Sequence, residues 1–245
     1  KYYKKVEDQK LKNLLITLGQ ELNEIFIFKR VNQILKITVM KPITKKGIWK
    51  QNIYDGIGQR FNISSCPNGV FIGGKTDSGK STLVRSILQT ANVQDNDVIV
   101  ISPKGSEDFK NGQKYTKELE DKIINTIQDA HEGKFKNKNT KYIVLDELIT
   151  LNNQFSKNAI KCINDALTII RSENLKFILC TQKLARSSVG IDFSLIPVKI
   201  LNVQDASLYE ASIGQKLKID LNKLKQGEFV LIDIDGEEKL LKNNI

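Results

Sequence analysis

The sequence predicts an α/β fold in which a mainly parallel sheet lies between helices, preceded by a small α/β module. From about Gly69 onward, short apolar runs alternate with longer amphipathic segments, the pattern of a doubly wound domain. Runs such as VIVIS and YIVLD are apolar throughout, as expected of parallel strands buried on both faces. The first 60 residues follow a different pattern. We therefore expect two parts, residues 1–60 and 61–245.

The N-terminal part combines one helical pattern with two β-rich runs. In residues 6–22 the leucines recur at helical spacing, which predicts an amphipathic helix. The runs Glu24–Val31 and Gln33–Val39 are separated by one residue, which predicts a hairpin.

The larger part alternates strand and helix patterns. The expected strands are Val70–Gly73, Asp97–Ser102, Tyr142–Asp146, Phe177–Thr181 and Val198–Val203. The expected helices are Lys80–Ala91, Thr116–His131, Lys157–Ser172 and Ala206–Ile213. Near the C-terminus, Phe229–Ile234 and Lys239–Leu241 flank an Asp-Gly pair, which predicts a second hairpin.

Composition excludes some classes of protein and leaves others open. No apolar run approaches the roughly 20 residues of a membrane span, and the single histidine, His131, excludes a His-built metal site. The three cysteines (Cys66, Cys162 and Cys180) lie far apart, so we expect core residues in a reduced chain. The net charge is +10, and residues 1–60 hold 13 Lys/Arg against 5 Asp/Glu. Such a surplus suits a polyanionic partner, and it equally suits an ordinary solvated surface.

The strongest chemical signal is a phosphate-binding loop between an apolar strand and a helix. It matches G-x-x-x-x-G-K-[ST] over the eight residues Gly74, Lys75, Thr76, Asp77, Ser78, Gly79, Lys80 and Ser81, with Thr82 following. In such a loop, backbone N–H groups converge on the phosphates of ATP, and the next helix adds its N-terminal dipole. We expect Lys80 to reach the β- and γ-phosphates and the Ser81 hydroxyl to ligate Mg²⁺.

Two further strands end in polar side chains. The run YIVL ends at Asp146 and Glu147, and ligands bind at this carboxyl edge in open α/β sheets. We expect Asp146 to hold Mg²⁺ through water and Glu147 to orient the attacking water. The run FILCT ends at Gln182, whose amide we expect near the γ-phosphate.

These motifs, in this order, resemble those of the FtsK/SpoIIIE branch of the FtsK–HerA superfamily, which are RecA-like P-loop NTPases. The segment ISPKG resembles the family's DPKG turn, with Ser102 where Asp is usual. LDEL resembles its second nucleotide-binding motif, and RSENL followed by FILCTQK resembles its RAAGIHLVLATQRP stretch. The resemblance covers about Gly69–Asp235.

The resemblance implies a homo-hexameric ring that threads double-stranded DNA through a pore, driven by ATP. It implies that Arg171 is an arginine finger reaching the neighbouring subunit's nucleotide, and that Lys183 and Arg186 contact the DNA backbone. A basic sensor of the family is missing from residues 204–207, which read QDAS.

We therefore expect a Mg²⁺-dependent ATPase that pumps DNA, in the transfer of a conjugative plasmid or element. We expect no DNA-recognition module, and the first residue is Lys1 rather than Met. We expect a cytoplasmic domain that a missing N-terminal segment could tether to the membrane, with relaxosome or secretion-channel proteins as further partners. Three alternatives stay open: a protein-secretion ATPase of the same superfamily, a phage or viral genome-packaging ATPase, and a nucleotide-binding assembly component without significant hydrolysis.

Overall fold

The computed structural model describes residues 25–31, 34–40, 53–54, 61–136, 138–169, 173–182, 189–203, 207, 210 and 216–243. The chain divides into two compact units, Lys1–Lys50 and Gln51–Ile245. In the smaller unit, β1 (Ile25–Val31) pairs antiparallel with β2 (Ile34–Met40), so the predicted hairpin is confirmed. The helix expected over residues 6–22 lies outside the described residues.

The larger unit contains a sheet that is nine-stranded over the described residues, in the order β3-β11-β10-β9-β4-β8-β7-β5-β6. Its strands are β3 (Ile53–Tyr54), β4 (Gly69–Gly74), β5 (Val98–Ile101), β6 (Gly112–Gln113), β7 (Lys141–Leu145), β8 (Leu175–Thr181), β9 (Lys199–Asn202), β10 (Glu228–Ile232) and β11 (Glu238–Asn243). The six strands from β9 to β6 pair in parallel. The other three add an antiparallel extension.

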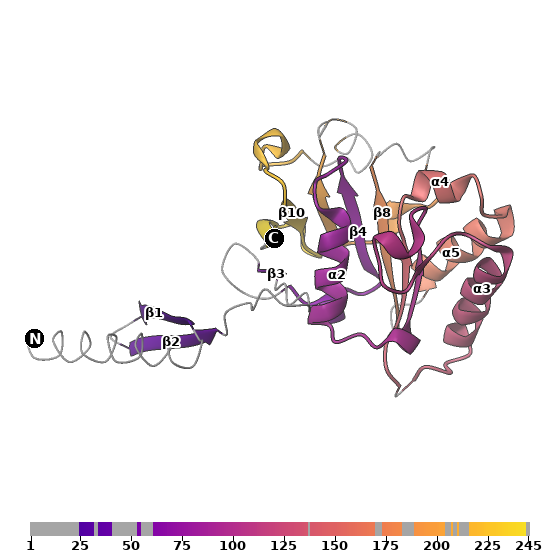
Figure 1. Ribbon diagram of the computed structural model, residues 1–245, viewed down its shortest axis with the longest axis horizontal. Helices are drawn as coiled ribbons and strands as arrows, with labels where there is room; N and C mark the ends of the chain where they lie inside the picture. Colours follow the sequence, from indigo (N-terminus) through magenta and orange to yellow (C-terminus); the bar gives the residue numbers. More distant parts are fainter. Residues whose placement is uncertain are drawn as a thin grey trace, which may run out of the picture. The chain divides into compact units, whose positions relative to one another are not determined.

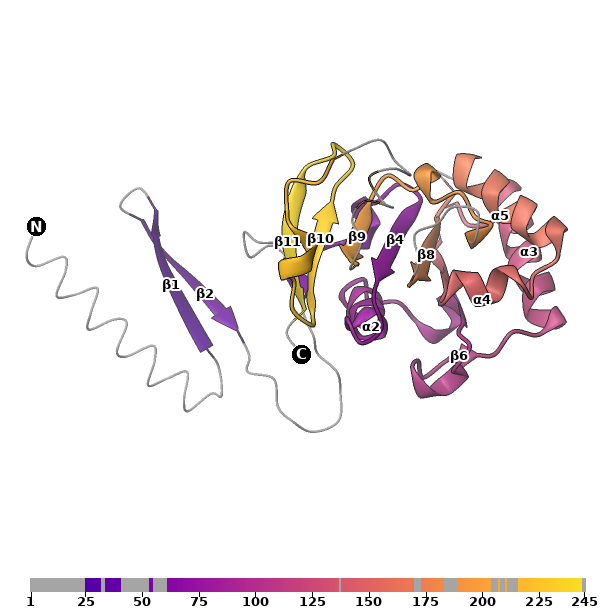
Figure 2. The ribbon, with the colours of Figure 1, turned by 90° about the horizontal axis from the view of Figure 1, so that it is seen from above.

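Helices cover both faces of this sheet (Figures 1 and 2). They are α2 (Lys80–Thr90), α3 (Lys117–His131), α4 (Leu148–Asn152) and α5 (Lys157–Ile169). Because side chains alternate along a strand, β4 directs Val70 and Ile72 into the core with α2 and Phe71 into the core with α3 and α5. The expected α/β fold with a mainly parallel sheet between helices is thus confirmed.

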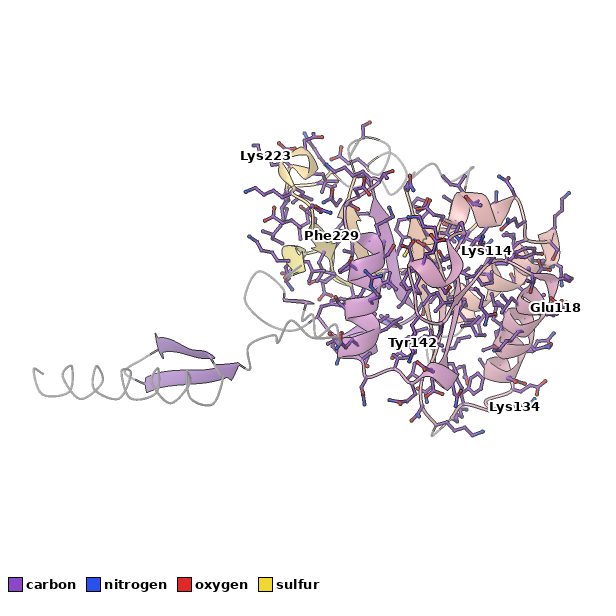
Figure 3. All side chains as sticks on the ribbon, in the orientation of Figure 1. Lys114, Glu118, Lys134, Tyr142, Lys223 and Phe229 are labelled. Atoms are coloured by element: carbon purple, nitrogen blue, oxygen red, sulfur yellow. The ribbon has the colours of Figure 1, made fainter. Side chains whose placement is uncertain are left out.

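Aromatic and charged side chains of the larger unit differ in burial. Tyr142 of β7 and Phe229 of β10 are buried between the layers, whereas Glu118 and Lys134 are exposed at the edge of the larger unit (Figure 3). Cys66 and Cys180 are buried free thiols, and Cys162 is half-buried. Within the part of the chain that is described, no helix has the length and hydropathy of a membrane span.

The structure adds elements that the sequence pattern does not predict. Strand β3 pairs with β11, so it belongs to the larger unit although residues 1–60 were expected to form the smaller one. β6 lies between the expected strand Asp97–Ser102 and the expected helix Thr116–His131, and α4 follows directly on Glu147. Of the helix expected over Ala206–Ile213, only Ser207 and Glu210 are described. The predicted C-terminal hairpin is confirmed as β10 and β11.

Candidate nucleotide-binding site

The loop between β4 and α2 closes tightly on itself. Gly79 (φ 95°) precedes the helix and Asp77 (φ 59°) is also left-handed. A Cβ placed on Gly74 would lie 2.6 Å from Ser78 Oγ and 2.9 Å from Lys80 Cγ. The glycine therefore allows a close approach of loop and strand end. Such turns direct successive N–H groups into one concavity, which binds anions, and the first turn of α2 adds its dipole.

Lys80 folds back over this loop. Its side chain is only 8% exposed. Nζ donates to the carbonyl oxygens of Gly74 (2.9 Å) and Lys75 (3.1 Å) and lies 3.8 Å from Glu147 Oε1. A buried ammonium needs such partners. An incoming phosphate chain can replace them, because its oxygens accept the same hydrogen bonds and carry more charge.

Asp146 and Ser102 meet because their strands are neighbours in register. Ile101 of β5 pairs with Leu145 of β7, so the next residue on each strand reaches the same edge of the sheet. Ser102 Oγ donates to Asp146 Oδ2 over 3.0 Å, and both side chains are buried. Burial raises the pKa of Asp146 to about 6; the bond from Ser102 opposes the rise, and the nearby charge of Glu147 adds to it.

The oxygen donors at this edge fit a hard cation such as Mg²⁺. Ser81 and Asp146 both line the same cavity. Among the described residues there is no group of three or more His, Cys, Asp and Glu side chains that could hold a metal by themselves. Mg²⁺ is usually bound through one or two side chains together with substrate phosphates.

Gln182 connects the loop with the acidic strand end. It follows β8, which lies between β4 and β7 in the sheet. Its Nε2 donates to Glu147 Oε1 (2.9 Å), and its Oε1 accepts from Thr76 Oγ1 (3.0 Å). Glu147 has left-handed backbone angles (φ 58°, ψ 63°), a conformation that non-glycine residues adopt at a cost and often at functional sites. The residues expected at the phosphates thus form one connected network.

A cavity of about 290 Å³ extends beyond the residues predicted from sequence. Its wall contains Thr76, Asp77, Gly79, Lys80, Ser81, Thr82, Asp146, Glu147 and Gln182, all predicted, and also Arg85, Pro103, Lys104, Asp108 and Gln226. Arg85 donates to the carbonyl oxygen of Asp108 (2.5 Å) and to Thr82 Oγ1 (3.0 Å), so α2 and the loop after β5 are joined here. Pro103 and Lys104 lie in the SPKG segment, which is recognisable in the sequence by its resemblance to the DPKG turn. No sequence motif indicated Gln226.

Three predicted residues lie outside the described part of the chain: Arg171, Lys183 and Arg186. Their expected roles, as arginine finger and as DNA contacts, therefore stay predictions. The roles of the described site residues are likewise predictions, although the structure brings them together around one cavity.

No protein-family model matches the sequence, and no curated protein matches it significantly. Solved structures do match. The pCW3 conjugation coupling protein TcpA, solved in a monomer form with ATPγS, is 16% identical with a TM-score of 0.58, and the match covers 96% of this chain and 81% of that one. The cytoplasmic domain of the type VII secretion ATPase EccC from Thermomonospora curvata is 19% identical with a TM-score of 0.56, over 79% of this chain and 28% of that one.

A third neighbour is the genome packaging NTPase B204 from Sulfolobus turreted icosahedral virus 2, in complex with AMPPCP. It is 17% identical with a TM-score of 0.51, over 72% of this chain and 97% of that one. These likenesses confirm the P-loop ATPase fold that the resemblance to FtsK/SpoIIIE-type proteins implied. The chain spans only about a quarter of the length of EccC, and identities this low do not separate the functions that the three proteins carry out.

Proposed function

We propose that this chain is an ATP hydrolase that uses the energy of hydrolysis to move DNA, in the transfer of a conjugative element. The observation that carries the proposal is the network around the cavity. Thr76, Gln182, Glu147 and Lys80 are linked side chain to side chain, and Ser102 holds Asp146 beside them. These are the groups that phosphoryl transfer to water requires, because catalysis there depends on positioning and on charge stabilisation.

Each residue has a chemical task in this proposal. The N–H groups of the loop and Lys80 bind the β- and γ-phosphates. Glu147 orients a water for attack on the γ-phosphorus, the bond to the β-phosphate oxygen breaks, and ADP and phosphate leave. Gln182 holds Glu147 in line with the attacking water. Mg²⁺, bound by Ser81 and by Asp146 through water, would neutralise charge between the β- and γ-phosphates.

Two observations support DNA as the cargo. The net charge of +10 is concentrated in residues 1–60, with Lys183 and Arg186 as further candidate phosphate contacts. The likeness to the conjugation coupling protein TcpA spans nearly all of this chain and most of that one, whereas EccC matches over only a small part of its length. From the resemblance to FtsK/SpoIIIE-type proteins, we also propose a homo-hexamer on the cytoplasmic side of the membrane, in which Arg171 acts on the neighbouring nucleotide.

The test is ATP hydrolysis with and without double-stranded DNA, with Lys80→Ala as the blank. We expect hydrolysis that depends on Mg²⁺ and is stimulated by DNA, with both lost in Lys80→Ala. A Lys183→Ala/Arg186→Ala double variant should lose most of the stimulation. A Lys110→Ala/Lys223→Ala double variant removes the same charge from exposed positions elsewhere and should keep it.

Two of the three alternatives, the protein-secretion ATPase and the assembly component, predict other results. Hydrolysis that does not respond to DNA would favour the alternative of a protein-secretion ATPase; the neighbour EccC is named a type VII secretion ATPase. Stimulation by DNA that survives loss of both Lys183 and Arg186 would place the DNA contacts elsewhere in the chain. Binding of ATP without hydrolysis under any of these conditions would favour an assembly component and contradict the proposal.

A further inference from the structure

The turn that leads into β10 lies directly against the phosphate-binding loop. Strand β9 pairs in parallel with β4 and antiparallel with β10, so the end of β9 and the start of β10 both lie next to the loop. The backbone N–H of Gly227 donates to the carbonyl oxygen of Ser78 over 3.0 Å. Gly227 has a φ of 78°, which favours glycine at this point of the turn. The preceding residue, Gln226, is exposed and forms part of the cavity wall.

Asn202, the last residue of β9, holds this turn in place. Its side chain is 1% exposed. Nδ2 donates to the carbonyl oxygens of Lys225 (3.0 Å) and Glu228 (2.6 Å), one on each side of Gln226. Its own carbonyl oxygen accepts from the N–H of Lys75 over 2.8 Å. One buried side chain thus fixes both ends of the turn, and its backbone fixes the second residue of the loop.

We propose that residues 225–228 are part of the nucleotide site, with Gln226 as a nucleotide-binding residue and Asn202 as the positioning residue that holds the turn on the loop. The amide of Gln226 donates a hydrogen bond to the bound nucleoside triphosphate. This inference rests on the proposed function. It adds a binding residue that no motif contains, and it connects the nucleotide to β10 and β11 through the bond between Gly227 and Ser78.

The first test is the Kd of ATPγS for Gln226→Ala, measured by calorimetry. Loss of one hydrogen bond predicts a Kd about threefold to tenfold weaker than that of the parent. Asn222→Ala is the matched control, because Asn222 is an exposed amide in the same connection and lies outside the cavity wall. It should bind like the parent. A Gln226→Ala variant that binds as tightly as Asn222→Ala overturns the proposal.

The second test addresses Asn202. In Asn202→Ala, with folding checked by circular dichroism, the turn loses both side-chain bonds. We expect KM for ATP to rise by a larger factor than kcat falls, a split that general destabilisation would not produce. In the parent protein, ATPγS should slow amide exchange over residues 224–229, and this protection should be lost in Asn202→Ala. If Asn202→Ala does not fold, the result for Gln226→Ala decides.

The two levels of proposal fail in different ways. A parent protein that does not bind ATPγS contradicts the proposed function. A parent that binds ATPγS normally, with no change in exchange over residues 224–229, overturns the role of the turn and leaves the proposed function intact.

Discussion

Gln182 Nε2 lies 2.9 Å from Glu147 Oε1, so the amide donates directly to the carboxylate that we expect to orient the attacking water. The same amide accepts from Thr76 in the phosphate-binding loop. The loop and the carboxylate come from segments more than 60 residues apart, and Gln182 lies between them because β8 separates β4 from β7. A change at the phosphates can therefore reach Glu147 through one side chain.

Replacing Gln182 with Ala should lower kcat for ATP hydrolysis by about tenfold and change KM by less than threefold. The variant keeps the loop and Lys80, which bind the nucleotide, but leaves Glu147 without the donor that fixes its orientation. Full general-base catalysis contributes about 10²- to 10⁴-fold, and misorientation removes part of it. Steady-state kinetics measure the effect. Thr76→Ser keeps the hydroxyl and should stay close to the parent, and a parent-like kcat for Gln182→Ala would contradict the prediction.

The Glu147→Gly variant should be more stable than the Glu147→Ala variant. The φ of 58° and ψ of 63° at this position are left-handed, which costs an L-residue about 1–2 kcal/mol. Glycine removes this cost but loses more entropy on folding, so the net difference expected between Glu147→Gly and Glu147→Ala is about 1 kcal/mol. Urea unfolding of the two variants measures it. Both variants lack the carboxylate and should lose hydrolysis. The difference in stability between them therefore reports the cost of the left-handed backbone and not the role of the carboxylate in hydrolysis.

A second left-handed residue provides the control. Asn92 has a φ of 51°, and asparagine tolerates this region better than most residues. Asn92→Gly should therefore change stability much less than the Gly-for-Ala exchange at position 147. Equal stabilities for Glu147→Gly and Glu147→Ala would show that the left-handed backbone there carries no strain.

The sequence was sufficient to predict the elements that carry their own pattern. Strands such as β4 and β7 are apolar and are followed by polar residues. Their burial, and the site residues at their carboxyl ends, can therefore be predicted from the residues of each segment alone. β6 cannot, because it is two residues long and is held by the N–H of Ser102 donating to the carbonyl oxygen of Gln113. This strand therefore forms because of a hydrogen bond to a neighbouring segment, and its own residues carry no strand pattern.

The same distinction applies to the site. The motifs around Lys80 and Asp146 can be placed at the edge of the sheet from the sequence alone, since each follows a recognisable strand. Arg85 and Gln226 are held at the cavity by tertiary contacts: Arg85 in part by the carbonyl oxygen of Asp108, and Gln226 by the turn that Asn202 holds. Neither contact leaves a pattern in the sequence.

Gly74→Ala should weaken ATP binding by about tenfold or more. The new Cβ would lie 2.6 Å from Ser78 Oγ, and relieving such an overlap costs about 1–3 kcal/mol. Ser78→Ala alone should have little effect, because Ser78 Oγ is buried and has no hydrogen-bond partner among the described residues. The double variant should recover part of the lost affinity, because the overlapping oxygen is gone. Kd values for ATPγS form the double-mutant cycle, with an expected coupling of about 1 kcal/mol; strictly additive effects would contradict the overlap as the cause.

Glu120 should make the stability of the larger unit depend on pH in the acid range. Its side chain is fully buried at the start of α3. It accepts hydrogen bonds from Lys117 Nζ (2.5 Å), from Ser156 N and Oγ (2.9 and 2.8 Å) and from Tyr115 (2.9 Å). Burial by itself would raise the pKa of Glu120, but these bonds outweigh it and lower the pKa to about 2.

Because the folded pKa is depressed, the ionised carboxylate stabilises the fold at neutral pH, and this contribution is lost as the pH falls from about 4.5 toward about 2. Glu120→Gln should cost about 2 kcal/mol at pH 7, since hydrogen bonds to a charged group are lost, and its stability should decline less steeply over that acid range. Urea unfolding at several pH values measures both effects. Glu118→Gln removes an exposed carboxylate from the same helix turn and should cost clearly less, so that equal losses at the two positions would contradict the role of the buried network.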